Sequence, residues 1–263
     1  MTTVILTAIG LVLGSFINAF VYRYHEEKNW ISDRSECVNC HHKLNIFDLV
    51  PILSYLFLRG QCHYCHKKIS IQYPVVEILT ALLFLLSYVY WPHKIQGIEL
   101  VVFIDWLILL VGLISLAIYD IKWMILPNKI LLFYGFFAFI YAVLNIFFIY
   151  DFHLSNLLGY IYSVLVSSGL FYSLFTASKG KWIGGGDVKL GLMLGLIAGT
   201  FEKAVLLIFL SSLIGSILSI ILVGLGRLNI KKTIPYGPFL ILSIYIIVLW
   251  GDKIVHWYNH FLV

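Results

Sequence analysis

Eight hydrophobic runs, each nearly free of charged residues, constrain this chain more than any other feature of its sequence. Most of them reach the roughly 17–25 residues that a helix needs to cross about 30 Å of hydrocarbon. We therefore expect an all-α integral membrane protein with about eight transmembrane helices. The runs are Val4–Tyr22, Pro74–Tyr90, Ile98–Tyr119, Ile130–Tyr150, Leu157–Thr176, Leu190–Phe201, Val205–Gly224 and Phe239–Trp250.

The positive charges are divided unequally between the two sides of these runs. Fifteen of the 18 Lys and Arg residues fall in alternate connections, beginning with the connection after the first run, and the opposite connections hold Lys94, Lys203 and Lys253. Because an excess of Lys and Arg marks the cytoplasmic side, we expect both termini to lie outside. The net charge of +5 follows from this bias, so no nucleic-acid partner is expected.

Composition agrees with a multi-pass protein of the cell membrane, since 61% of the residues are hydrophobic and only 12% are charged. The sequence divides into three segments. Residues 1–23 are the first transmembrane helix, residues 24–73 are a long cytoplasmic loop, and residues 74–263 are a seven-span membrane domain.

All four cysteines lie in the long loop, as two CxxC pairs: Cys37 with Cys40, and Cys62 with Cys65. Two such pairs supply the four thiolates of a closed tetrahedral zinc site. Two disulfides are the alternative, but the cytoplasm keeps thiols reduced. A closed site leaves no coordination position for a substrate, so we assign the zinc a role in folding and none in catalysis.

Histidines adjoin both pairs, and one of them could replace a cysteine as ligand. With four thiols available we expect all four histidines to be solvated: His41, His42, His63 and His66. Between the pairs, Asp48–Leu58 is a mostly apolar stretch interrupted by Pro51. It is too short to span a membrane, so it lies at the membrane interface or packs against the zinc site.

Two aspartates stand at the cytoplasmic ends of spans. Asp120 directly follows the third run, and Asp187 directly follows Gly184, Gly185 and Gly186. The glycines have no side chains, so an extended foreign backbone can approach Asp187 closely. They also break the helix, and the apolar run that follows is only about 12 residues long. Such a span is permitted where protein buries it or where it lines a wet cavity.

Two carboxylates at one depth can form an aspartic-protease dyad, in which like-charge repulsion makes the pair share one proton. Alternatively, Asp120 is a helix-end group and Asp187 pairs with Lys189. Two other classes of protein stay open at this point. A transporter can also use a broken span with carboxylates, although no repeat is visible here. A non-catalytic scaffold could present the zinc loop but would leave both aspartates unexplained.

The chain resembles the type IV prepilin leader peptidases, which belong to the GxGD aspartyl proteases. The resemblance runs in family order from residue 14 to residue 239 and is carried by several motifs. These are Gly14-Ser15-Phe16-Ile17-Asn18 with Tyr22-Arg23, the cysteine loop with Asp48-Leu-Val-Pro51, Tyr73-Pro74-Val-Val-Glu77, Tyr119-Asp120 with Leu126-Pro127-Asn128, Gly184-Gly185-Gly186-Asp187-Val188-Lys189, and Ile234-Pro235-Tyr236-Gly237-Pro238-Phe239.

The resemblance implies a bifunctional enzyme that faces the cytoplasm. Asp120 and Asp187 would cleave the basic leader from prepilins or pseudopilins, and Gly184, Gly185, Gly186 and Lys189 would form the active-site loop. The enzyme would then methylate the new N-terminus with S-adenosylmethionine. Its substrates could serve type IV pili, secretion or competence for DNA uptake, and the sequence leaves these three open.

Glu77 lies one turn into the second span, where a carboxylate is energetically costly and is a functional candidate by default. The matching Tyr73–Glu77 stretch places it in the part of the family that is associated with methylation. Pairing with a loop Lys or Arg at the interface is the alternative.

Overall fold

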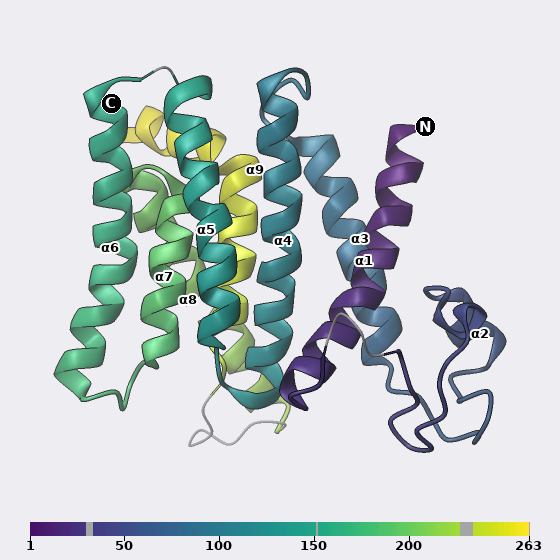
Figure 1. The fold of residues 1–263 in the computed structure, drawn as a ribbon. Coiled ribbons are helices and arrows are strands. Elements are labelled where there is room, and N and C mark those ends of the chain that lie inside the picture. Colours follow the sequence, from purple (N-terminus) through teal and green to yellow (C-terminus); the bar gives the residue numbers. More distant parts are fainter. Residues whose placement is uncertain (30–33, 151, 227–233, 263) are drawn as a thin grey trace. The chain divides into compact units, whose positions relative to one another are not determined.

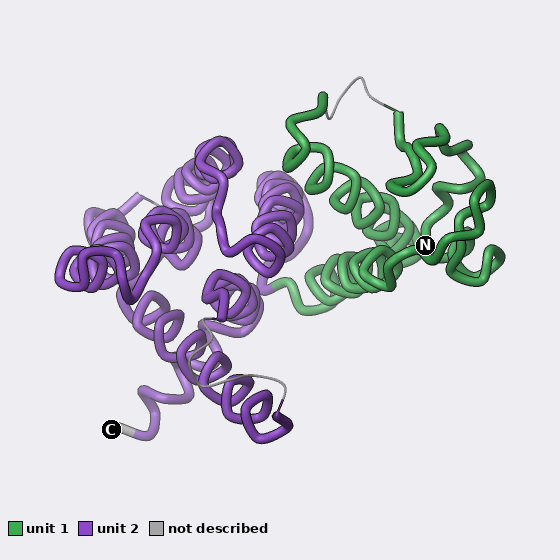
Figure 2. Tube along the Cα trace, turned by 90° about the horizontal axis from the view of Figure 1, so that it is seen from below, with its two compact units in different colours: residues 1–91 green, residues 92–263 purple. Residues whose placement is uncertain are grey.

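The computed structural model describes residues 1–29, 34–150, 152–226 and 234–262. Within them the regular elements are helices, and two isolated β-bridges lie in the cysteine loop. The chain forms two compact units, residues 1–91 and 92–263 (Figure 2). The elements are α1 (Thr2–His25), η1 (Ile46–Leu49), α2 (Leu53–Phe57), α3 (Gln72–Tyr90), α4 (Ile98–Trp123), α5 (Asn128–Leu144), η2 (Asn145–Ile149), α6 (Leu154–Ser178), α7 (Gly185–Ala198), α8 (Phe201–Gly224) and α9 (Gly237–Leu262).

The expected all-α membrane class is confirmed. In the described part of the chain, seven helices are long and apolar enough to cross a bilayer. The remaining run, Leu190–Phe201, forms most of α7, which has 14 residues and is therefore only about 21 Å long. It ends because Gly199 takes a left-handed conformation with φ of 77°, and Phe201 already begins α8. Three of the fifteen counted positive charges, Arg227, Lys231 and Lys232, lie outside the described residues.

In unit 1, α1 and α3 pack with their backbones almost in contact. A Cβ built on Gly10 would lie 2.6 Å from Cα of Ala81, and one built on Gly14 would lie 2.6 Å from Cα of Glu77. Glycines four residues apart let two membrane helices approach this closely, and van der Waals packing then holds the pair together in lipid. The Asn18 side chain adds a polar link by donating to the Tyr73 carbonyl at 3.2 Å.

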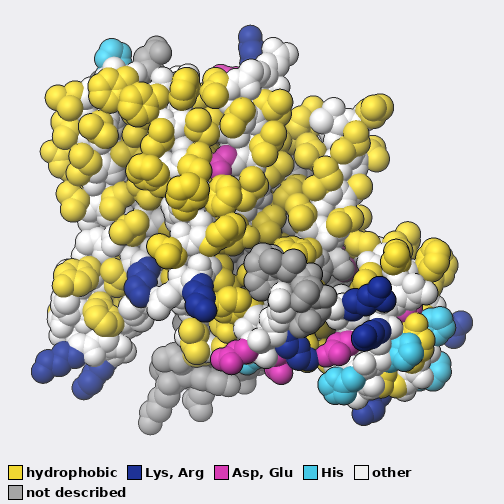
Figure 3. All heavy atoms as spheres, viewed as in Figure 1, with side chains coloured by type: hydrophobic (Ala, Val, Ile, Leu, Met, Phe, Trp, Pro, Cys, Tyr) yellow, Lys and Arg dark blue, Asp and Glu magenta, His cyan; other side chains and the backbone are white. Residues whose placement is uncertain are grey.

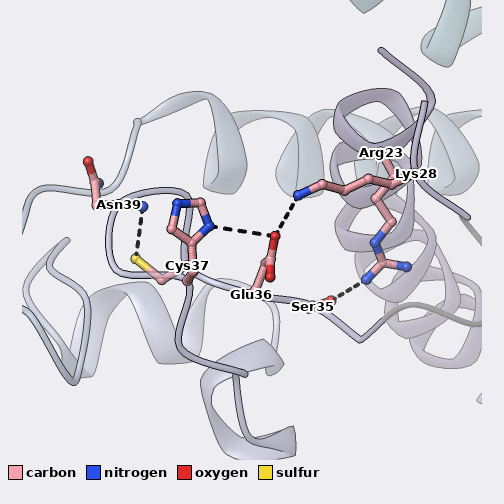
Figure 4. Close-up of polar contacts among 7 residues, drawn as sticks. Arg23, Lys28, Ser35, Glu36, Cys37 and Asn39 are labelled. Atoms are coloured by element: carbon pink, nitrogen blue, oxygen red, sulfur yellow. Dashed lines mark hydrogen bonds and ion pairs between the residues drawn. The ribbon is translucent and has the colours of Figure 1, made fainter. Parts of the chain in front are cut away.

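The cysteine loop is tied to the end of α1 by two side chains (Figure 4). Arg23 donates to Ser35 Oγ at 2.9 Å, and Lys28 Nζ lies 2.6 Å from Glu36 Oε1. The hydrogen bond between Lys28 and Glu36 lowers the pKa of Glu36 and raises that of Lys28. Both links lie directly before the first CxxC pair, so they join its hairpin to the end of the preceding helix.

In unit 2, the short helix α7 packs against α5, α6, α8 and α9. Leu190 and Leu194 are fully buried. Two glycines of α7 face α6: a Cβ on Gly191 would lie 2.9 Å from the Ser167 carbonyl, and one on Gly195 would lie 2.8 Å from Cα of Val164. Protein thus covers most of α7, although Leu192 is 46% exposed, and such burial is the condition under which a short, glycine-interrupted span is tolerated.

The two ends of unit 2 differ in character. The α4–α5 and α6–α7 connections and the start of α9 lie at the lower end in Figure 1, and the α5–α6 and α7–α8 connections lie at the upper end. Hydrophobic side chains cover the sides of these helices, while most of the visible Lys and Arg side chains of unit 2 lie at the lower end (Figure 3). The lower end holds both aspartates singled out from the sequence.

We expect Gly10→Ala to destabilise unit 1, because the added methyl group meets the backbone of Ala81 and overpacking of this kind costs about 1–3 kcal/mol. Gly135→Ala in α5 is the matched control, since nothing lies within 4 Å of its Cβ position. Thermal unfolding in detergent should show a lower midpoint for Gly10→Ala and an unchanged or slightly higher one for Gly135→Ala. Equal midpoints would contradict the close packing of α1 on α3.

Candidate functional site

Asp120 is buried near the end of α4, where only one more turn of helix follows it. Its Oδ2 atom accepts a hydrogen bond of 3.0 Å from the backbone N–H of Gly237, the first residue of α9. A helix N-terminus presents free N–H groups and a positive dipole, so it stabilises a nearby carboxylate. A Cβ on Gly237 would lie 2.6 Å from the same oxygen, and glycine is therefore the residue that fits.

Asp187 lies in the first turn of α7, and its side chain is half-buried. Its Oδ2 accepts from the N–H of Gly184 at 3.3 Å, while its own N–H donates to the Gly184 carbonyl at 3.1 Å. This reciprocal pair caps the helix. Gly185 and Gly186 are thus the first residues of α7, although the sequence suggested a break in the helix there. A Cβ on Gly186 would lie 2.9 Å from Leu126 Cβ, so this glycine also serves packing.

The two aspartates share one end of unit 2, where the end of α4 meets the starts of α7 and α9 (Figure 1). They are close enough for the charge of Asp120 to act on Asp187. Lys189 does not pair with Asp187 there: its Nζ atom donates to Asn128 Oδ1 at 2.6 Å and links α7 to the start of α5. Where one carboxylate charge acts on another, repulsion favours the state in which one of the two carries a proton.

Two further residues belong to this end of unit 2 and were not assigned a role from the sequence. Gly237 contributes its N–H to Asp120, and Asn128 contributes its amide oxygen to Lys189. Both residues lie within motifs that carry the family resemblance. That was the only signal available, since neither residue type suggests chemistry by itself.

In unit 1, the four cysteines converge. Their sulfur atoms all lie within 4.8 Å of one another, and the Cys37 and Cys65 sulfurs are 3.9 Å apart. A tetrahedral zinc with Zn–S bonds of about 2.3 Å places its sulfurs about 3.8 Å apart. All four cysteines are free thiols, and none of them forms a disulfide. The donor set and its spacing fit a structural zinc ion.

The two CxxC pairs have the same backbone conformation. The N–H of His41 donates to the Cys37 carbonyl at 2.9 Å, and the N–H of His66 donates to the Cys62 carbonyl at the same distance. Both histidines have positive φ angles, 56° and 57°. The β-bridges Glu36–Lys43 and Gln61–Lys68 then close the two hairpins in the same way. This repetition turns both pairs of sulfurs toward one point.

The loop histidines take part in contacts outside the sulfur cluster. His63 Nδ1 lies 3.3 Å from Asp48 Oδ1, and the Tyr64 hydroxyl donates to Asp48 Oδ2 at 3.2 Å. Burial would raise the pKa of Asp48, but hydrogen bonds from the Asn45 N–H, His63 and Tyr64 hold it below its usual value. The His42 ring packs on Tyr64 with centroids 3.6 Å apart. Asp48 thereby fastens η1 to the second hairpin.

Glu77 is buried in α3, and its Oε2 atom accepts a hydrogen bond of 2.8 Å from the backbone N–H of Ile52. The Ser15 side chain is hydrogen-bonded to the same carboxylate. Ile52 has φ of 61° and ψ of −50°, and the Leu53 N–H donates to the Pro51 carbonyl at 2.6 Å. These angles define a γ-turn of the rare, strained type. Glu77 thus holds the start of α2 against α3.

Two family models match the chain. The Bacterial Peptidase A24 N-terminal domain matches residues 8–91, which is most of unit 1, and the Type IV leader peptidase family matches residues 107–220, within unit 2. No solved structure matches the chain.

Curated relatives match over almost their whole length. A prepilin leader peptidase/N-methyltransferase of Bacillus subtilis is 33% identical, covering 97% of this chain and 96% of the relative. The protein of the same name from Pseudomonas aeruginosa is 31% identical over 96% of this chain and 92% of its own, and that of Legionella pneumophila is 29% identical over 95% and 91%. Identity of this extent, together with the two family models, shows that the chain belongs to the type IV prepilin leader peptidase family.

Proposed function

We propose that this protein is a membrane aspartyl endopeptidase that removes the basic leader from type IV prepilins or pseudopilins and then methylates the new N-terminus. The observation that supports this most is full-length similarity to proteins named prepilin leader peptidase/N-methyltransferase. The placement of Asp120 near the end of α4 and of Asp187 at the start of α7, both at one end of unit 2, supports the peptidase activity independently. A transporter or a non-catalytic scaffold accounts for neither observation.

In the proposed mechanism, Asp120 and Asp187 share one proton. The ionised member takes a proton from a water molecule as that water attacks the scissile carbonyl, and the protonated member donates to the carbonyl oxygen. The departing amine then receives a proton from the dyad as the carbon–nitrogen bond breaks. The N–H groups of Gly237 and Gly184 hold the two carboxylates in place throughout.

The distribution of charge supports a cytoplasmic active site. Lys122, Lys129, Lys179 and Lys181 belong to the connections at the end of unit 2 that holds the aspartates, and Lys203 belongs to the opposite end, where it pairs with Asp252 at 2.8 Å. By the positive-inside rule the aspartates face the cytoplasm and both termini lie outside. A basic leader retained on that side could therefore reach the dyad.

We assign zinc to Cys37, Cys40, Cys62 and Cys65. Bound there, zinc would stabilise the loop by joining two hairpins that share little apolar core, and metal binding to such a site is coupled to folding of its loop. The ion would take no part in hydrolysis, because four thiolates would fill its coordination shell.

For the second activity, the proposed methyl donor is S-adenosylmethionine, which supplies an electrophilic methyl group when bound. Glu77 is the candidate that this chain offers, because a buried carboxylate complements the positive charge of the donor's sulfonium. Its hydrogen bond to Ile52 N–H gives it a second task, which is to position α2.

Replacing either aspartate should abolish cleavage. Asp120→Asn and Asp187→Asn remove proton transfer while conserving shape, so we expect the rate of leader removal to fall by about 10²–10⁴-fold or more. The matched control is Asp252→Asn, which alters an aspartate in α9 that pairs with Lys203. Membranes containing each variant would be incubated with a prepilin, and the product N-terminus identified by mass spectrometry. Near-parental cleavage by either active-site variant would remove that aspartate from the mechanism.

Zinc should be lost when one thiolate is removed. We expect about one zinc per chain in the parent protein, much less in Cys62→Ser, and new protease sensitivity within residues 24–73 of that variant. His41→Asn is the control, because asparagine tolerates the positive φ at this position while the imidazole is lost. Elemental analysis would measure the metal. A parent protein without zinc, or loss of zinc in His41→Asn, would contradict the four-cysteine assignment.

Glu77→Gln should lower methyl transfer more than leader removal. Its amide oxygen can still accept from Ile52 N–H, so the loop stays in place while the negative charge is lost. Radiolabel transfer from S-adenosylmethionine and leader removal would be measured on the same preparation. Equal loss of both activities would assign Glu77 a structural role, and unchanged methylation would place the methyltransferase site elsewhere.

A further inference from the structure

The segment between the two CxxC pairs presents an exposed apolar face. We call the loop face the set of large hydrophobic side chains on η1 and α2 that are between 52% and 83% exposed: Ile46, Phe47, Leu53, Leu56 and Phe57. These side chains are therefore not packed against the sulfur cluster, which was one of the two placements expected from the sequence. An exposed apolar group of this size, rimmed by polar residues, marks an interaction surface.

The contact between Ile52 and Glu77 indicates how far below the edge of the hydrocarbon the loop face lies. Helix α3 has 19 residues and is about 28 Å long, so it needs its whole length to cross the hydrocarbon. Its first residue, Gln72, must then lie close to the hydrocarbon edge. Glu77 lies five residues further in, about 7–8 Å along the axis, and it bonds directly to Ile52. The start of α2 therefore lies at the depth where interfacial helices bury their apolar faces, about 5–10 Å.

The apolar surface also continues on α3 itself. Val75, Ile78 and Leu79 belong to the first turns of this helix and are 51%, 50% and 44% exposed. In a transmembrane helix such side chains face lipid. The loop face thus lies at the same level as a surface that already contacts the bilayer.

Positive charges adjoin the loop face on the second hairpin. Arg59 comes two residues after α2. The hairpin brings Lys67 and Lys68 back next to Arg59, because the Ile69 N–H donates to the Gly60 carbonyl at 2.8 Å. All three cations are exposed. Figure 3 shows the same division, with hydrophobic side chains on the upper side of the loop, and Lys, Arg and His side chains mostly below them. Cations next to an apolar face complement the phosphates above an acyl layer.

We propose that the loop face inserts into the bilayer leaflet from which α1 and α3 emerge, at the boundary between headgroups and acyl chains, and anchors the cysteine loop to the lipid surface. Asp48 makes the anchor rigid, because its contacts with His63 and Tyr64 join η1 to the second hairpin. This inference does not rest on the proposed enzymatic activities.

Photo-crosslinking of the full chain tests the anchor. Phe57→p-benzoylphenylalanine and Phe47→p-benzoylphenylalanine would be placed in nanodiscs of phosphatidylethanolamine and phosphatidylglycerol. The control is Asn39→p-benzoylphenylalanine, an exposed polar position on the first hairpin. The excited benzophenone inserts into C–H bonds, so acyl chains within reach become attached. We expect several-fold more phospholipid adduct at positions 47 and 57 than at 39, measured by mass spectrometry of the digested protein.

Three results would overturn the proposal: equal adduct at all three positions, cross-links from 47 and 57 to residues 92–263 of the same chain in place of lipid, or cross-links to a second copy in place of lipid. A thermal midpoint equal to that of the parent protein would verify that each variant is folded. A second readout uses Phe57→Ser with the label kept at position 47. If the two side chains form one anchor, the adduct at 47 should fall, and an unchanged adduct would contradict a shared lipid contact.

Discussion

A bilayer offers no hydrogen-bond partners to a peptide backbone, and unit 2 depends on how its shortest helix meets that constraint. Helix α7 has 14 residues, too few to span the hydrocarbon with its ends in water. Its ends are instead satisfied by protein: Asp187 caps the first turn, and Ser163 Oγ donates to the Gly195 carbonyl at 2.8 Å. Gly191 and Gly195 permit this closeness to α6. Gly191 and Gly195 are thus the residues that let α6 cover one face of this short helix.

A short helix also begins and ends within the body of the protein, and this explains where the carboxylates lie. Asp187 occupies the first turn of α7, and Asp120 contacts the first N–H of α9. Each negative charge therefore faces the positive end of a helix. Burial and mutual repulsion disfavour two ionised carboxylates in one place, whereas the helix ends favour ionisation. The proposed sharing of a single proton rests on the balance between these opposing effects.

The sequence predicted features that rest on local pattern or on one span at a time. The hydrophobic runs predicted the long helices. The spacing of the two CxxC pairs predicted the sulfur cluster, because each pair folds as its own hairpin. The contacts of Gly237 with Asp120, Lys189 with Asn128, and Ile52 with Glu77 join residues 117, 61 and 25 positions apart. Periodicity carries no information about such pairs. Gly184–Gly186 illustrate the limit: glycine composition suggested a broken helix, but whether a helix starts there depends on Leu126 and α6, which the local sequence does not contain.

The hydrogen bond between Glu77 and Ile52 satisfies a buried carboxylate and a strained turn at the same time. A charge at this depth must have partners, and a γ-turn of positive φ at Ile52 carries strain of about 1–3 kcal/mol that its surroundings must offset. The hydrogen bond between them meets both demands, since the turn points an otherwise unpaired N–H at the carboxylate. A hydrogen bond to an ionised carboxylate is about twice as strong as a neutral one. In the proposed anchor, the depth of α2, and with it the placement of the cysteine hairpins, thus follows from the position of a single acidic residue in α3.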